Sequence, residues 1–322
     1  MKLLVANLGS TSFKYRLFEV GAGDERLLAK GGFERVTDFG GAIRTGLDEM
    51  EESGALASRS EIEAVGFKTV LGRNLSGCVE ADEAVLEALE GFAEVAPAHN
   101  PAYAAGIRQF REILPGARQV ALFETAFYQW VPEAATRYAV PEAWHAAGIR
   151  RYGFHGASHK FIAERSAEML GREEVAEGVR RLYQDGPPEI TPPVRVVSCH
   201  LGGSSSVTGI RNGVAVGTSM GFSPQSGLPQ NNRVGDLDSG AIPYAGKALG
   251  LGMEEIEAQL TREGGLLGLS GVGNDLRDVK EAADAGNARA RLAVDVLVHE
   301  TRRWASSFLF ALGGLEAFAV SY

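Results

Sequence analysis

The chain has 322 residues, of which 45% are apolar and 23% are charged, and this composition is typical of soluble globular proteins. Its length predicts about two domains, and its net charge of -9 argues against a nucleic-acid-binding surface. The apolar run at the N-terminus is interrupted by polar residues too early for a signal peptide, and no later run is long enough to span a membrane. We therefore expect a cytoplasmic protein that binds neither nucleic acid nor membrane.

The two cysteines are Cys78 and Cys199. They form no C-x-x-C pair and are too few for a disulfide framework. We expect both to be small buried residues rather than redox groups.

The first half of the chain alternates predicted strands and helices. Apolar runs predict strands over 2–6 and 13–20 on either side of a Gly/Ser turn. Alternating apolar residues predict further strands, and a 3.6-residue period predicts two helices. In chain order these are a strand over 62–69, helices over 81–92 and 102–114, and a strand over 119–123.

The second half begins with strands and ends with helices. Strands are predicted from residue 194 onward, and Asn212-Gly213 between two alternating runs indicates a hairpin turn. Helices are predicted over 253–260 and 288–312.

Two short segments resemble each other, the sequence LGSTS at 8–12 and the sequence LGGSSS at 201–206. In each case one apolar strand precedes the turn and another follows it. The repeat suggests two similarly built halves with a cleft between them, although so short a match of small residues can also arise by chance.

Gly/Ser turns between strands offer free backbone N–H groups and hydroxyls at which a phosphate can approach closely. The chain lacks the G-x-x-x-x-G-K-[S/T] pattern of a Walker A loop and the strand-linked G-x-G-x-x-G of a Rossmann site. For either loop taken alone, an ordinary hairpin turn is the better interpretation.

Polar and charged residues surround both turns. Asn7 and Lys14 flank the first turn, and His200 precedes the second. Phosphoryl transfer needs positioned cations and Mg²⁺ rather than a covalent nucleophile. Further clusters of suitable residues lie at 99–101, 124–125, 151–159, 231–238 and 274–278.

Other chemistries fit less well. His155 and His159 are four residues apart but lack the H-E-x-x-H pattern of a zinc protease. A G-x-S-x-G string is centred on Ser219, but no helix is predicted after it, as a nucleophile elbow requires. Asp236 and Asp238 could serve a glycosidase only at a separation that sequence does not reveal.

Taken together, the motifs resemble those of the acetate kinase (acetate/propionate kinase) family. The matching segments follow one another along the whole chain: 7–14 (NLGSTSFK), 99–101 (HNP), 123–127 (FETAF), 152–159 (YGFHGASH), 200–202 (HLG) and 218–222 (TSMGF). The resemblance implies an α/β, actin-like fold of the sugar kinase/Hsp70 superfold. This fold is duplicated, with a central cleft between an N-terminal domain over 1–135 and a nucleotide-binding domain over 136–322.

The resemblance also implies roles for individual residues. The catalytic residues would be His155, Arg233, Glu124 and Lys68. The carboxylate would be bound by His99, Asn100 and Pro101, and Asn7 would bind the metal. The nucleotide would be bound by Ser10, Ser12, Lys14, His200, Gly202, Gly203, Ser204, Asp275, Leu276 and Arg277.

The activity implied is reversible phosphorylation of a short-chain carboxylate, with acetate as the first expectation, by direct in-line transfer from ATP. Mg²⁺ would neutralise charge on the phosphates, and the products would be ADP and an acyl phosphate. The family resemblance also implies a homodimer.

The chain departs from the family pattern at several points. Lys68 replaces an arginine and loses its bidentate fork, for which Arg73 could compensate, and Glu124 replaces an aspartate. Family members also continue beyond the position of Tyr322 into a Gly-rich nucleotide loop, a metal-binding glutamate and a terminal helix, so we expect a truncated sequence or a degenerate relative. Two other hypotheses are a non-catalytic nucleotide-binding or regulatory protein and a sugar kinase, the latter disfavoured by the 99–101 and 152–159 matches.

Overall fold

The computed structural model describes residues 1–9, 11–21, 24–72, 75–94 and 100–322. The chain divides into two compact units, unit 1 over Met1–Gln129 and unit 2 over Trp130–Tyr322. The domain boundary predicted between residues 135 and 136 lies inside unit 2 and stays a prediction. No helix in the described part of the chain is both long and apolar enough to cross a bilayer.

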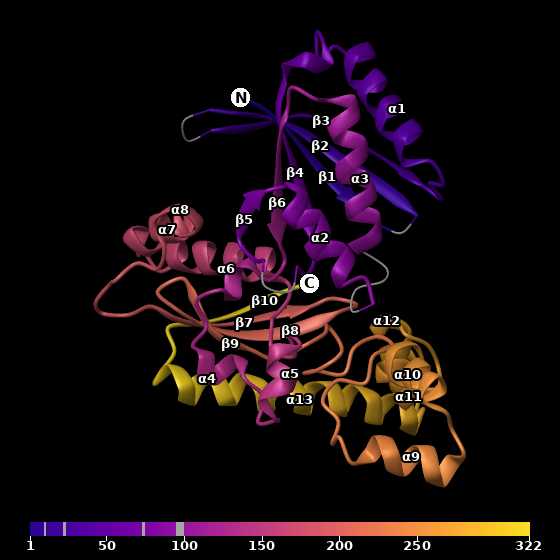
Figure 1. The fold of residues 1–322 in the computed structure, drawn as a ribbon. Helices are drawn as coiled ribbons and strands as arrows, with labels where there is room; N and C mark the ends of the chain where they lie inside the picture. Colours follow the sequence, from indigo (N-terminus) through magenta and orange to yellow (C-terminus); the bar gives the residue numbers. More distant parts are fainter. Residues whose placement is uncertain (10, 22–23, 73–74, 95–99) are drawn as a thin grey trace. The chain divides into compact units, whose positions relative to one another are not determined.

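Unit 1 is built on a six-stranded mixed sheet with the strand order β3-β2-β1-β4-β6-β5 (Figure 1). Its first three strands form an antiparallel meander, and β1, β4 and β6 are parallel. The edge strand β5 pairs antiparallel with β6. The strands are β1 Lys2–Leu8, β2 Ser12–Val20, β3 Glu25–Glu34, β4 Ile62–Thr69, β5 Cys78–Glu80 and β6 Arg118–Phe123.

The two faces of this sheet differ because side chains alternate along each strand. One face is apolar and is packed by two helices, α1 (Phe39–Glu52) and α3 (Asn100–Ile113). Gly46 of α1 lies against the ring of Tyr15, and Gly106 of α3 lies against Leu8, so both helices cover the same face. The shorter helix α2 (Glu83–Gly91) packs on α3. The opposite face carries polar and charged side chains from β1, β2, β3 and β4.

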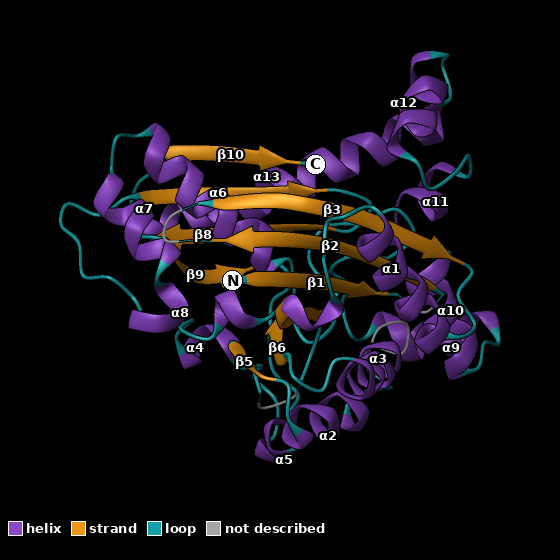
Figure 2. Cartoon of the chain, turned by 90° about the horizontal axis from the view of Figure 1, so that it is seen from above, coloured by secondary structure: helices purple, strands orange, loops and turns teal. Residues whose placement is uncertain are grey.

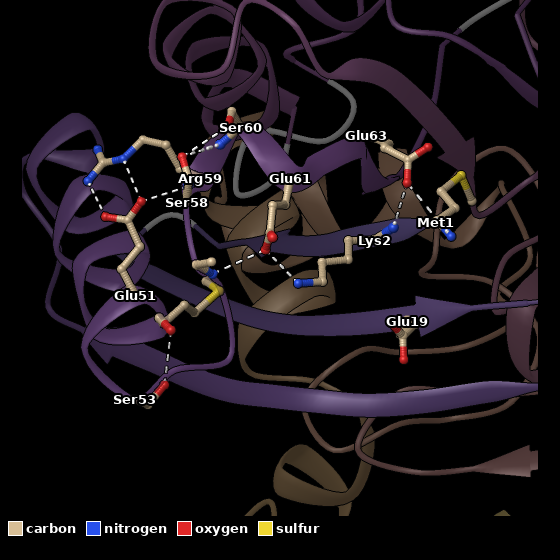
Figure 3. A network of polar contacts seen from close by, with 12 residues as sticks. Met1, Lys2, Glu19, Glu51, Ser53, Ser58, Arg59, Ser60, Glu61 and Glu63 are labelled. Atoms are coloured by element: carbon tan, nitrogen blue, oxygen red, sulfur yellow. Dashed lines mark hydrogen bonds and ion pairs between the residues drawn. The ribbon is translucent and has the colours of Figure 1, made fainter.

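A network of ion pairs holds the start of β1 to the segment that precedes β4 (Figure 3). Lys2 Nζ lies 2.5 Å from Glu61 Oε2, and the N-terminal amino group lies 3.7 Å from Glu63. Arg59 in the short helix η1 (Arg59–Glu61) donates hydrogen bonds to Glu51 at the end of α1. These contacts join β1, β4 and α1 at one end of unit 1.

Unit 2 repeats part of this topology in a four-stranded sheet with the order β10-β7-β8-β9. The meander of β7, β8 and β9 is antiparallel, and β10 pairs parallel with β7, as β4 does with β1. This correspondence confirms the predicted duplication. The strands are β7 Arg195–Leu201, β8 Ser205–Arg211, β9 Val214–Thr218 and β10 Ala317–Ser321.

Helices pack on both faces of the unit 2 sheet (Figure 2). The long helix α13 (Ala288–Leu312) packs Phe308 and Leu312 against Val197, Cys199 and Val207. Helix α6 packs on the other face, against β7 and β10. The remaining helices of the unit, with α6, are α4 Glu133–Thr136, α5 Glu142–Ala146, α6 Gly156–Met169, α7 Glu173–Arg180, α8 Leu182–Asp185, α9 Ala241–Leu249, α10 Met253–Arg262, α11 Gly265–Ser270 and α12 Leu276–Asp284.

Two sequence predictions are settled by the fold. Asn212 and Gly213 both have positive φ, 51° and 79°, which is the turn expected of a tight hairpin between β8 and β9. The prediction that both cysteines are buried holds for Cys199 and is wrong for Cys78. Cys78 lies on the short edge strand β5, where the sheet leaves it exposed.

Candidate active site

The most polar part of the unit 2 interior lies between α6 and its sheet. His159 lies in the first turn of α6, and His155 is the residue immediately before the helix. Ser198 and His200 are two residues apart on β7 and therefore face the same side of the sheet, where Ser206 lies opposite His200 on β8. The start of α6 and this face of the sheet thus bring three histidines and two serines together.

These side chains form a continuous hydrogen-bonded chain. His155 Nδ1 lies 2.8 Å from Ser206 Oγ, and the same oxygen lies 2.8 Å from His159 Nε2. The other ring nitrogen of His159 lies 2.8 Å from Ser198 Oγ. Ser198, Ser206 and His159 are fully buried, so each of these polar atoms depends on its neighbour in the chain.

The chain can donate protons in either of two directions, each of which satisfies all three hydrogen bonds. When Ser198 donates to His159 Nδ1, His159 donates through Nε2–H to Ser206, and Ser206 donates to His155 Nδ1. Neutral His155 then carries its proton on Nε2 and can donate it to an anion. The reverse direction makes Nδ1 of His155 the donor and removes the proton from Nε2 when the ring is neutral.

Burial fixes the charge of His159. Desolvation lowers the pKa of His159 well below its ordinary value, and the neighbouring His155 and His200 lower it further. His159 is therefore neutral at physiological pH and serves as a polar link rather than as a cation.

His155 occupies a strained backbone position. It has φ 60° and ψ 28°, the left-handed region that non-glycine residues rarely adopt, immediately before the first residue of α6. Its ring lies 4.2 Å from that of His200, centroid to centroid. His200 in turn hydrogen-bonds through Nδ1 to Ser158 Oγ at 3.0 Å. The strain is offset by the ring contact with His200 and the hydrogen bond with Ser206.

Arg233 is the cation that contacts the second Gly/Ser loop. Its Nη1 donates long hydrogen bonds to Ser204 Oγ at 3.3 Å, to Gln230 Oε1 at 3.4 Å and to the carbonyl of Pro224 at 3.4 Å. None of the carboxylates in the described ranges forms an ion pair with it. Burial lowers the pKa of Arg233, although a guanidinium remains charged at any physiological pH. A half-buried cation without a counter-charge is suited to an anionic ligand.

The Gly/Ser loop itself contacts the segment that carries Arg233. The backbone N–H of Asn231 donates to the carbonyl of Gly203 at 3.2 Å, and Ser204 Oγ donates to Gln230 Oε1 at 2.7 Å. A Cβ on Gly203 would lie 3.0 Å from the Asn231 amide. Gly202 follows β7 two residues after His200, so the loop links the histidine cluster to Arg233.

In unit 1, Asn7 lies at the end of β1 on the polar face of the sheet. Its Oδ1 accepts a 2.8 Å hydrogen bond from Tyr103 Oη on α3. Burial raises the pKa of Tyr103, and the charge of Glu124 raises it further, so the phenol stays protonated and donates. Lys14, opposite Asn7 on β2, pairs with Glu34 at 3.0 Å, and Ser12 begins that strand.

Two residues predicted to be catalytic form an ion pair in unit 1. Lys68 Nζ lies 2.5 Å from Glu124 Oε1, and Glu124 is only 8% exposed. Lys68 is the penultimate residue of β4 and Glu124 follows the neighbouring parallel strand β6, so both lie at the carboxyl edge of the sheet. The pairing neutralises much of the charge that Lys68 would offer a substrate.

Other predicted site residues lie apart from these clusters. The amide nitrogen of Asn100 donates to the carbonyls of Leu71 and Leu89, at 2.8 Å and 3.0 Å, in a fully buried position, while Pro101 beside it is exposed. Asp275 caps α12 and pairs with Arg277 at 2.6 Å on the surface, next to exposed Leu276. Three predicted or suggested residues lie outside the described residues: Ser10, Arg73 and His99.

Sequence reasoning missed four residues that hold the site in place. Ser206 and Gln230 carry no charge that would mark them as site residues. Tyr103 has the position of an ordinary core residue on a helix. His159 belongs to the 151–159 cluster and to a histidine pair that lacks the H-E-x-x-H pattern, and neither feature gave it a role. The signal that could have found Ser206 is its register opposite His200 in a predicted hairpin. Contact between Tyr103 and Asn7 depends on the packing of α3 and has no local signature.

Comparison with known proteins identifies the family to which the chain belongs. A family model described as the acetokinase family matches residues 32–321. The chain is 36% identical to an acetate kinase of Geobacillus kaustophilus (strain HTA426), covering 98% of this chain and 81% of that protein. The chain belongs to the acetokinase family.

Solved structures agree with this family assignment and confirm the predicted α/β, actin-like fold class. An acetate kinase from Porphyromonas gingivalis matches the acetokinase-family chain with a TM-score of 0.84 at 33% identity, covering 98% of this chain and 82% of that one. A propionate kinase from Francisella tularensis matches with a TM-score of 0.81 at 29% identity, over 98% and 82% of the two chains. Ser219 of this acetokinase-family chain lies in no nucleophile elbow, because its Oγ is buried, accepts from the backbone N–H of Val207 at 2.9 Å, and is followed by no helix before α9.

Proposed function

We propose that this chain transfers the γ-phosphoryl group of ATP reversibly to a short-chain carboxylate, with acetate as its principal acceptor. A carboxylate oxygen forms the new bond to phosphorus, and the bond between that phosphorus and the bridging oxygen breaks. ADP leaves with the bonding electron pair, and an acyl phosphate forms. Acetate and propionate kinases among the similar proteins support both the reaction and the choice of acids.

The observation that carries this proposal is the half-buried guanidinium of Arg233 without a carboxylate partner, next to the Gly/Ser loop. In the transfer, Arg233 would bind two oxygens of the phosphoryl group or the carboxylate through its planar fork. His155 would donate its Nε2–H to a phosphoryl oxygen, in the tautomer in which Ser206 donates to its Nδ1. Such preorganised donors stabilise the charge that spreads over the phosphoryl oxygens in the transition state.

The residues of unit 1 would serve the phosphates and their metal ion. The described residues contain no group of three or more His, Cys, Asp or Glu side chains suited to a metal. A site with few protein donors fits Mg²⁺, because Mg²⁺ typically takes one or two protein oxygens and is otherwise held by substrate phosphates and water. Asn7 and Glu124 would supply those oxygens, and the ion would neutralise phosphate charge. We further propose that Lys14, Ser12 and the Gly202–Ser204 loop bind the nucleotide.

The test is a hydroxamate trap for acyl phosphate, with ATP, Mg²⁺ and either acetate, propionate or butyrate. We expect product from the wild type and a loss of about 100-fold or more in kcat for Arg233→Ala, because an oriented charged donor is removed. Arg233→Lys keeps the positive charge but loses the planar fork of the guanidinium. Its kcat should therefore lie between those of the wild type and Arg233→Ala.

The matched control is Arg211→Ala, which removes an exposed arginine at the end of β8 in the same unit. Unchanged turnover in Arg233→Ala would contradict the assigned role. A folded wild type that binds ATP but forms no acyl phosphate with any acid would instead favour the non-catalytic nucleotide-binding hypothesis.

A further inference from the structure

Four cationic side chains gather on the polar face of the unit 1 sheet. They come from three strands and line one hollow of about 560 Å³. The residues that line this hollow include Val5, Asn7, Lys14, Arg16, Lys30, Gly31 and Lys68. Asn7 and Lys14 have a role in the function proposed above, and Lys68 is the ion-pair partner of Glu124. Arg16 and Lys30 are left without a role.

Arg16 and Lys30 are directly opposite each other in the antiparallel pair of β2 and β3. Side chains at opposite positions in antiparallel strands lie about 5 Å apart at Cβ, and like charges there destabilise the sheet. Neither residue has an ion-pair or hydrogen-bond partner within the part of the chain that the structure describes. The fold therefore retains a repulsive pair that a single neutral substitution would remove.

The two other cations of the hollow each form an ion pair with a glutamate. Lys14 pairs with Glu34 at 3.0 Å, and Lys68 pairs with Glu124 at 2.5 Å. The uncompensated charge thus belongs to Arg16 and Lys30 alone, in a chain whose net charge is -9.

We propose that Arg16 and Lys30 form an anion subsite for a phosphate group, which extends the row of phosphate-binding residues along β2. The guanidinium offers a planar fork to two phosphate oxygens, and the ammonium adds a point charge from the next strand. The ligand is a phosphate-bearing anion, either the phosphate chain of the nucleotide or the acyl phosphate. The choice between these two rests on the proposed function, whereas anion binding itself does not.

Binding is tested with inorganic pyrophosphate on the whole chain, by titration calorimetry without metal. We expect the double variant Arg16→Gln/Lys30→Gln to bind at least tenfold more weakly than the wild type. The control is Arg26→Gln, which removes one positive charge from β3 at the other end of the strand, where Arg26 pairs with Glu19 at 2.7 Å. Equal binding by the wild type and the double variant, or no binding by the wild type, overturns the proposal.

A second measurement separates a binding role from a structural one. Without anion, the double variant should melt at the same temperature as the wild type or higher, because the repulsive pair is gone. Addition of pyrophosphate should raise the melting temperature of the wild type and of Arg26→Gln but not that of the double variant. A double variant that melts lower and still gains stability from pyrophosphate overturns the proposal.

Measurements of KM for the double variant identify which phosphate-bearing ligand the subsite binds. A fivefold or larger rise in KM for ATP alone assigns the subsite to the nucleotide, and the same rise for acetyl phosphate alone, in the reverse reaction, assigns it to the acyl phosphate. An unchanged KM for both overturns the catalytic use of the subsite. Pyrophosphate binding by a wild type without turnover contradicts the proposed function while it still supports the subsite.

Discussion

His159 shows how burial decides what a residue can do. The same side chain could bind a metal or move a proton on a surface, but here both ring nitrogens are used by serines at 2.8 Å. Through Ser206, the tautomer of His159 is coupled to that of His155, two hydrogen bonds away. His159 is thus a positioning residue for the proposed donor.

Because the pKa of His159 is lowered in the folded state, its effect on stability depends on pH. Below about 6.5, the ordinary pKa of a histidine, the unfolded chain binds a proton at this residue that the folded chain does not. The stability is therefore fully present above this pH and is lost as pH falls. We expect wild type to lose up to about 1.4 kcal/mol per pH unit more than His159→Asn, measured by urea unfolding between pH 7.5 and 5.

The control for this titration is His299→Asn, since His299 is exposed on α13. It should keep the pH dependence of the wild type. The same pH dependence in His159→Asn as in the wild type would show that His159 titrates normally in the folded chain.

The sequence predicts the site only as far as local periodicity reaches. Ser198 and His200 could be placed on one strand face from their spacing alone. The spacing of His155 and His159 does not place them, because His155 lies before α6 with positive φ. The contact of Tyr103 with Asn7 and the lack of a counter-charge at Arg233 arise from packing between distant segments. No spacing rule contains that information, so those features required the structure.

At the scale of elements, strong periodicity separates what could be predicted from what could not. The strand over 62–69 and the helix over 288–312 have the bounds that the sequence predicts. Strand β3 and helix α1 were missed because glycines weaken both signals, at Gly31 and Gly32 in the strand and at Gly40 and Gly41 in the helix.

Gly31 has a packing reason that its local sequence does not reveal. A Cβ there would lie 2.4 Å from Tyr15 Oη, which donates a 2.8 Å hydrogen bond to Glu49 on α1. Gly31→Ala should therefore displace the ring and break this bond, at a cost of about 1–3 kcal/mol in the free energy of unfolding. Chemical denaturation measures the change.

Gly91→Ala is the matched substitution, because a Cβ at the end of α2 meets no atom within 4 Å. Its free energy of unfolding should stay within about 1 kcal/mol of the wild type. If Gly31→Ala is as stable as Gly91→Ala, then Tyr15 can move aside without a cost in the free energy of unfolding. The close approach of Gly31 and Tyr15 would then contribute nothing to stability.

At the scale of the whole molecule, the short repeat of Gly and Ser residues correctly indicated two related halves. The shared strand order, a meander followed by a parallel strand, is the basis of that similarity. The sequence could not supply the extent of each unit, because the helices inserted after β6 and β9 have no counterpart in the repeat.

All six strands of the unit 1 sheet and the helices that cover it come from the first 129 residues. We expect the segment Met1–Gln129 to fold by itself, with a cooperative thermal transition measured by circular dichroism. The isolated segment should also unfold over a similar denaturant range to the first transition of the whole chain. A gradual, non-cooperative melt would show that unit 1 depends on the rest of the chain.

The pairing of β10 with β7 has a consequence for biosynthesis. Ala317 pairs with Val196, so roughly 120 residues are translated after β7 before its second neighbour exists. At ordinary elongation rates this interval is on the order of ten seconds. During that time one edge of a nascent strand rich in valine stays open to any other extended chain nearby. In unit 1 the corresponding wait is about half as long, because Leu3 of β1 pairs with Ala64 of β4. The edge of β7 is therefore the one that stays open longer and benefits more from protection by a chaperone.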